Sequence, residues 1–246
     1  MDRIRAVADQ YPEWKDQEPY KSIIANDMKG VMKSGMKGLM QMIMTTHADM
    51  SSNEYDTIVS EWLKTAKHPK FDQPFNKMVY QPMIELLDYL RANDFTTFIV
   101  SGGGIQFMRV WATEAYNIPS HQIVGSSVKS KFQFNDGEAK IMRLPEINFI
   151  DDKAGKPVGI YEHIGKKPIF ASGNSDGDLQ MLQYTDSNAY PSFQLYLHHT
   201  DAEREWAYDR DSHIGKLDKG LDEAKAKGWT VIDMKTDWNT IFPFSK

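Results

Sequence analysis

The chain has 246 residues, which suits one large domain or a domain with a smaller insert. Hydrophobic residues make up 41% and charged residues 26%, so we expect a sizeable core and no global disorder. The net charge of −5, without a long basic run, argues against nucleic acid or an anionic membrane as a partner.

Two features of the sequence narrow the chemistry further. The chain contains no cysteine, which excludes disulfides, thiolate metal sites and cysteine nucleophiles. No apolar run approaches the ~20 residues that cross a bilayer, and the N-terminus continues into amphipathic sequence without a signal-peptide core. We therefore expect a soluble protein, cytoplasmic or periplasmic. The sequence leaves its compartment and its oligomeric state open.

The first 75 or so residues have a helical pattern. Ser51-Ser52-Asn53-Glu54 matches a capping box, and apolar residues recur after it at the spacing of one helical face. Before it, a methionine occurs at every fourth position: Met28, Met32, Met36, Met40 and Met44. Such a series either fills a helical core or lines an adaptable binding surface, and we interpret it as core.

From Phe75 onward, helices alternate with short apolar strands. We predict strands over 95–100, up to the turn at Gly173, over 195–197 and over 230–232, with a hairpin over 128–144. The helices are expected around 83–90, 105–116, 157–164, 201–209 and 216–227. This alternation predicts a parallel, doubly wound α/β sheet.

The stretch 170–179 is a strand end, a tight turn and a helix start. Asn174, Asp176 and Asp178 gather oxygen atoms there, at the edge where open α/β sheets bind their ligands. Hard cations such as Mg²⁺ prefer these atoms, although Asp and Ser also occur at helix N-caps for structural reasons. An EF-hand is excluded because Leu179 and Thr185 occupy the positions that require Gly and Glu.

A second strand end carries Ser101-Gly102-Gly103-Gly104 directly before a helix. Backbone amides at such a helix start can bind an anion, while the alternative is tight strand–helix packing. A dinucleotide fingerprint would need glycine where Phe107 stands, and no GxxxxGK[ST] loop is present. Lys156 begins the helix that leads to Gly173 and could face a phosphate, with Lys153 as a competitor.

Taken together, Ser101 after a strand, Lys156 at a helix start and the acidic turn 173–178 resemble motifs two to four of the haloacid dehalogenase superfamily, in particular its phosphoserine phosphatase-like members. The resemblance implies a Rossmann-like three-layer α/β/α core over 76–246 and a helical cap over 1–75. It also implies Mg²⁺-dependent hydrolysis of a small phosphorylated metabolite through an aspartyl-phosphate. Specificity would lie in the cap, and the substrate stays open.

The resemblance also implies roles for individual residues. Ser101, Gly102, Gly103 and Lys156 (or Lys153) would bind the phosphate. Asn174, Asp178 and Asp176 would hold the Mg²⁺. Asn174 stands where the family usually has an aspartate, and a neutral amide oxygen is the weaker ligand.

The family's first motif, Asp-x-Asp-x-Thr on the central strand, does not occur before Ser101. It would supply the nucleophile and the acid/base. We expect either a truncated chain, which we favour, or a catalytically inactive relative that binds a phosphate ligand or a partner. Asp209-Arg210-Asp211 has the right spacing but follows no apolar strand, and the adjacent His198 and His199 would point to opposite faces of a strand.

The missing strand has a structural corollary. A gap should separate the strand ending at Ser101 from the strand ending at Gly173, with a loss of stability or a filling of the slot by another strand. In this chain we predict little or no turnover.

Overall fold

The computed structural model describes residues 1–245, and for Met36, Leu39 and His47 it describes the backbone alone. The chain forms two compact units. Unit 1 comprises Met1–Ile58 and Val128–Asn148, and unit 2 comprises Val59–Ser127 and the chain from Phe149 onward. This grouping places 59–75 with unit 2 and the hairpin with unit 1, unlike the predicted division at residue 75. The role of the N-terminal region as a cap stays a prediction.

Unit 1 begins with short helices. They are α1 (Asp2–Val7), η1 (Ala8–Gln10), η2 (Pro12–Lys15), α2 (Tyr20–Ile24), α3 (Met28–Lys33) and α4 (Gly35–His47), followed by β1 (Met50–Ser51) and the start of α5 (Ser52–Thr65). Their core is a cluster of Ile4, Trp14, Tyr20, Ile23 and Val31. The predicted capping box is confirmed: the Ser51 amide donates to Glu54 Oε2 at 2.7 Å, and the Glu54 amide donates to Ser51 Oγ at 3.3 Å.

The methionine series does not form the core of these helices. Met28 and Met32 are 46% and 56% exposed, so the core interpretation is wrong for them. Met42, outside the series, is the methionine that packs against the cluster. The side chain of Met36 lies outside the described residues. Gly30 and Gly35 interrupt the four-residue spacing of the methionines. The chain turns at Gly35, whose φ is +55°.

The predicted hairpin is confirmed as β3 (Ile123–Asn135) and β4 (Glu138–Phe149). Asp136 and Gly137 form its two-residue turn with φ of +52° and +80°. Positive φ at both central positions is the geometry that suits the twist of a two-residue hairpin, which explains the Asp-Gly pair. Within unit 1, β1 pairs with β4 in antiparallel register.

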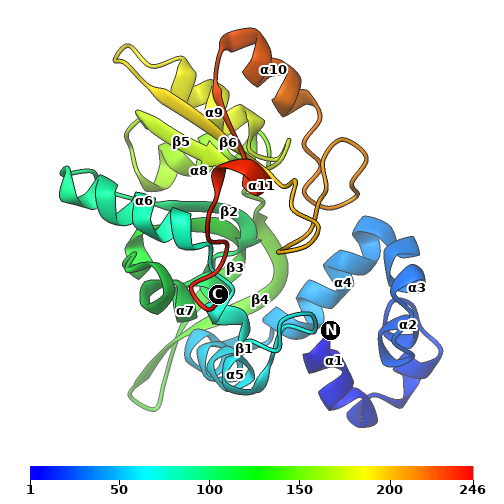
Figure 1. Cartoon of the computed structure of the whole chain (residues 1–246). Coiled ribbons are helices and arrows are strands. Elements are labelled where there is room, and N and C mark those ends of the chain that lie inside the picture. Colours follow the sequence, from blue (N-terminus) through cyan, green and yellow to red (C-terminus); the bar gives the residue numbers. More distant parts are fainter. Residues whose placement is uncertain (246) are drawn as a thin grey trace. The chain divides into compact units, whose positions relative to one another are not determined.

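Unit 2 alternates helices and strands. Its elements are η3 (Phe75–Lys77), α6 (Gln81–Ala92), β2 (Ile99–Gly104), α7 (Ile105–Tyr116), η4 (Ser120–Gln122), the start of β3, α8 (Gly155–His163), β5 (Phe170–Gly173), α9 (Leu179–Asp186), β6 (Phe193–His198), α10 (Lys219–Lys227), β7 (Thr230–Asp233) and α11 (Met234–Asp237). Strands β2 and β3 pair in parallel, and β5, β6 and β7 form a parallel three-stranded sheet (Figure 1).

Helices cover both faces of these strands. Neighbouring residues of a strand point to opposite faces, and the residues on each face pack against helices. On β6, Tyr196 joins a cluster with residues of α8, α9 and α10, while Leu197 joins a cluster with α11 and the C-terminal segment. On β2, Val100 packs on the first of these clusters and Ile99 packs with α6 and α7. The predicted three-layer α/β/α core is confirmed.

The sheet of unit 2 is interrupted where the missing strand was expected. Among the described strands, β2 ends one sheet and β5 ends the other, and no ladder joins them. A cavity of about 700 Å³ lies between, lined by 93–98 before β2, by 166–172 along β5, and by apolar residues of α6 and α8. The predicted gap is therefore present, and no strand of the described chain fills it.

One predicted strand has different bounds, and one predicted helix was wrong. The strand expected over 95–100 begins at Ile99 and extends through the glycines to Gly104. The helix expected over 201–209 is a series of turns, because the Asp201 carboxylate accepts from the backbone amides of Glu203 and Arg204 and holds a local turn there. In the described part of the chain, none of the helices has the length and apolar character needed to span a bilayer.

Candidate functional site

The acidic turn after β5 is built around Asp178. Its Oδ2 accepts from the backbone amides of Asn174 and Ser175, at 2.9 and 3.1 Å, and from the Ser175 hydroxyl. A Cβ added to Gly173 would lie 2.4 Å from the Asp178 Cβ, so only glycine fits at the strand end. The Asp178 carboxylate therefore fixes the shape of the turn.

Lys156 joins this turn to the neighbouring strand end. Its Nζ lies 3.2 Å from Asp178 Oδ1 and donates to the carbonyl oxygen of Val100 at 2.6 Å. The Lys156 side chain is 6% exposed, whereas Lys153 is exposed and has a φ of +52°. Of the two predicted lysines, Lys156 is the one that the structure places beside both Asp178 and β2.

The Ser101 loop lies at the same edge, directly after Val100. The Ser101 hydroxyl oxygen accepts from the Gly103 amide at 3.1 Å, which leaves its own hydrogen to be donated to a ligand. Ser126 holds the loop from the adjacent strand by donating to the Gly102 carbonyl at 2.9 Å. Ser101, Lys156 and Asp178 thus converge on the two sides of the gap between β2 and β5.

An acid that the sequence analysis did not single out lies next to this group. Asp151 is fully buried, and no described side chain lies within hydrogen-bond distance of its carboxylate oxygens. Burial raises the pKa of Asp151 to about 6, against the opposing effects of the Lys156 charge and of the Ser101 backbone amide. Its amide donates to the Ser126 hydroxyl at 2.9 Å. The available signal was an aspartate pair directly after the apolar Phe149-Ile150, which is the signature of a strand end.

The side-chain nitrogen of Asn174 contacts a series of hydrogen-bonded side chains. Its Nδ2 lies 3.2 Å from His199 Nε2, and His199 Nδ1 lies 3.0 Å from Glu205 Oε2. Tyr80 donates to the other Glu205 oxygen at 3.0 Å. His198 points instead to Asp209, at 3.3 Å. The two adjacent histidines therefore have different partners, as the alternation of a strand requires.

Asp176 contacts the start of α10. Its two oxygens accept from the backbone amides of Asp218, Lys219 and Gly220 at the start of α10, at 2.9, 3.3 and 2.9 Å. Carboxylates at helix N-termini are stabilised by unpaired amides and by the helix dipole. Asp176 thus has the structural role of a cap, and the helix that it caps is α10, far along the chain.

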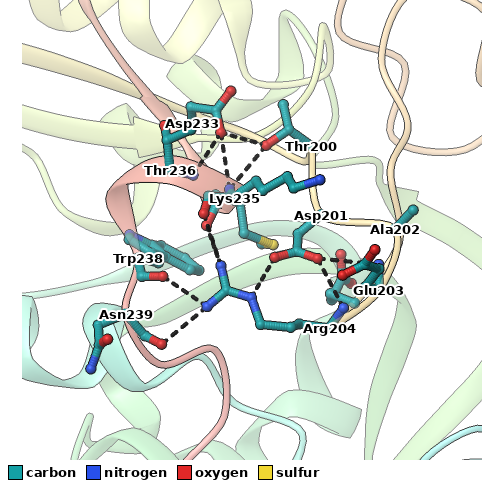
Figure 2. A network of polar contacts seen from close by, with 12 residues as sticks. Thr200, Asp201, Ala202, Glu203, Arg204, Asp233, Lys235, Thr236, Trp238 and Asn239 are labelled. Carbon is teal, nitrogen blue, oxygen red and sulfur yellow. Dashed lines mark hydrogen bonds and ion pairs between the residues drawn. The ribbon is translucent and has the colours of Figure 1, made fainter.

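The loop after β6 is fixed by Arg204. Its guanidinium contacts the Asp201 carboxylate at 2.5 Å and donates to the carbonyls of Trp238 and Asn239 at 2.9 and 3.0 Å (Figure 2). The same group also reaches the carbonyls of Met234 and Lys235. Because these bonds tie the loop to α11, the segment 199–205 that carries His199 and Glu205 has a defined path.

Comparisons with known proteins identify the family of the chain. The family described as haloacid dehalogenase-like hydrolase matches residues 3–183. The chain belongs to this haloacid dehalogenase-like family. A phosphoserine phosphohydrolase-like protein from Francisella tularensis subsp. tularensis SCHU S4 is a similar solved structure, with 14% identity, 81% of this chain and 80% of that chain covered, and a TM-score of 0.39. No curated protein matches.

Members of the haloacid dehalogenase-like family use Mg²⁺, so the residues must be tested against a hard cation. The buried Asp151 carboxylate fits it, since its oxygens are the kind of ligand that a hard cation prefers. So does Asn174, whose nitrogen is already engaged. No group of three or more His, Asp or Glu side chains in the described residues is arranged to hold a metal ion.

Proposed function

We propose that this protein is the larger part of a Mg²⁺-dependent phosphatase that hydrolyses a small phosphomonoester. The observation that supports this most directly is the convergence of Ser101, Lys156 and Asp178 at the ends of β2 and β5, which no backbone ladder joins. Ligands bind at this edge in open α/β sheets. The membership of the family adds the hydrolase chemistry.

The residues of this chain divide into two groups by charge. Ser101 and Lys156 supply a hydroxyl donor and a cation, which suit the oxygens of a phosphoryl group. Asn174 and Asp151, with Asp178 holding the turn, supply oxygen atoms for Mg²⁺, which would neutralise charge on the phosphoryl group in the transition state. Lys156 is already poised between both groups through its contact with Asp178.

The nucleophile belongs to neither group. We infer that it comes on a strand outside these 246 residues that occupies the slot between β2 and β5. Apolar side chains of α6 and α8 line the slot together with Phe95, Phe98 and Ile169 of the flanking segments, as a buried strand requires, and polar residues such as Thr97 and Lys167 lie among them. A strand parallel to its neighbours would end beside Ser101 and Lys156, where an Asp-x-Asp sequence would face them.

Hydrolysis of p-nitrophenyl phosphate with Mg²⁺ tests this function. We expect no turnover above background from the 246-residue chain and clear turnover from a version extended upstream by an apolar strand ending in Asp-x-Asp-x-Thr. The matched control carries the same extension with Asn in place of both aspartates. Turnover by the 246-residue chain would refute the need for the added strand, and an inert extended chain would favour a protein that binds a phosphate ligand without hydrolysing it.

A further inference from the structure

The hydrogen-bonded side chains next to Asn174, His199 and Glu205, determine how a neutral amide could bind a cation. An asparagine side chain presents an oxygen on one side and an NH₂ group on the other, and only the oxygen can bind a cation. An unconstrained Asn174 would therefore face a cation with the wrong atom part of the time. Whatever fixes the rotation of its amide also fixes its value as a ligand.

Glu205 is the starting point of that constraint. It is 6% exposed and accepts hydrogen bonds from His199 Nδ1, from the Trp206 amide at 2.9 Å and from the Tyr80 hydroxyl. Burial alone would raise the pKa of Glu205, but these hydrogen bonds outweigh it and hold the pKa below its ordinary value. Glu205 is therefore a carboxylate, which can only accept.

The carboxylate determines the state of His199. Because Glu205 accepts, His199 Nδ1 must carry a proton and donate it, and in the neutral imidazole Nε2 is then an acceptor. The ring cannot turn over easily, since it is 2% exposed and stacks on Tyr208 with 4.4 Å between ring centroids. In the neutral ring, Nε2 therefore faces Asn174 as a hydrogen-bond acceptor.

An acceptor at that position selects the NH₂ side of Asn174. The distance of 3.2 Å from Nδ2 to His199 Nε2 matches this orientation. With its NH₂ group on the His199 side, the amide has its oxygen on the opposite side.

We propose that Glu205 and His199 are positioning residues that fix the Asn174 amide with Oδ1 as the cation ligand. The inference rests on the proposed Mg²⁺-dependent function. It accounts for an asparagine at this place. An aspartate faces a cation with an oxygen in either orientation, because its two oxygens are equivalent, whereas Asn174 needs the relay Glu205–His199–Asn174 to keep its single oxygen on that side. Arg204 donates to the carbonyls of Met234 in α11 and of Trp238 after it (Figure 2), which ties the loop between His199 and Glu205 to the C-terminal segment.

Mn²⁺ binding to the 246-residue chain, followed by electron paramagnetic resonance of the free ion, measures the consequence. The variant His199→Leu should weaken binding about 10- to 100-fold, as the loss of outer-shell partners commonly does. The control His198→Leu alters the neighbouring histidine outside the relay and should bind as the parent does. Adding Asn174→Asp to His199→Leu should restore binding, because a carboxylate needs no orientation. A merely structural role of His199 would not be rescued in this way.

Glu205→Gln preserves the volume of the side chain and covers the case in which His199→Leu does not fold. The ¹⁵N signals of His199 in the parent chain give a readout without metal: we expect the Nδ1–H tautomer, with Nε2 unprotonated. An Nε2–H tautomer, or equal Mn²⁺ affinity in parent and both single variants, would overturn the proposal. If the 246-residue chain binds no Mn²⁺, the same variants are compared in the chain extended by the Asp-x-Asp strand, where equal affinities overturn the role of His199. Hydrolysis by that extended chain judges the proposed function separately.

Discussion

Replacing Lys156 with methionine should destabilise the protein strongly. The side chains of Lys156 and Asp178 are 6% and 11% exposed, so water cannot take the place of the ammonium group. Removing one partner of a buried ion pair costs about 3–5 kcal/mol. Asp178 Oδ2 keeps its three other donors, which puts the expected loss near the lower end, at about 3 kcal/mol.

Chemical unfolding in urea measures this loss, and thermal unfolding should show a fall of about 6–12 °C in Tm for a chain of this size. Lys153→Met is the matched control, because the exposed Lys153 should change stability by no more than about 0.5 kcal/mol. The double variant Lys156→Met with Asp178→Asn removes the unpaired charge and should lose less than the sum of the single variants. Strict additivity, or a loss below about 1 kcal/mol for Lys156→Met, would refute the coupling described here.

Three further outcomes follow from individual residues. Because burial raises the pKa of Asp151 to about 6, the folded state holds its proton more tightly, and in chelator the unfolding free energy should fall by up to about 3 kcal/mol between about pH 4 and pH 6. Asp151→Asn should abolish that slope in urea titrations at each pH, and an unchanged slope would disprove the assignment. Arg204→Met leaves the buried Asp201 without its cation and should cost about 3 kcal/mol by the same measurement, while a loss within experimental error would contradict the role of the loop anchor. Ser51→Ala removes the cap of α5 and should cost about 1 kcal/mol, with Ser52→Ala as the neighbouring control that should cost less.

The sequence was informative where local chemistry decides the structure. The helix over 105–116 was predicted at the bounds that α7 has, because glycines precede it and Asn117 ends it in the left-handed region with φ of +53°. The capping box at Ser51 and the turn at Asp136-Gly137 likewise depend on residues within a few positions of one another. Short apolar runs between helical segments then located β5, β6 and β7.

The parts that failed depend on partners far along the chain. Asp176 is a carboxylate of the kind that binds cations, but it accepts from the amides of Asp218 and Gly220 at the start of α10. The residues near Asp176 in the sequence do not indicate this long-range contact. Asp151 was overlooked because its burial arises from tertiary packing. His199 was correctly kept apart from His198, but its link to Asn174 joins residues 25 positions apart.

The interrupted sheet has a consequence for how the core opens. Strands β2 and β3 pack in a cluster with α7, whereas β5 and β6 pack with α8 and α9, and no backbone ladder joins the two halves. Side chains such as Val100 and Lys156 hold them together. Amide hydrogens of β2 and of β6 should therefore exchange through separate local openings with different free energies, and a strand inserted between the halves should merge them into one cooperative unit.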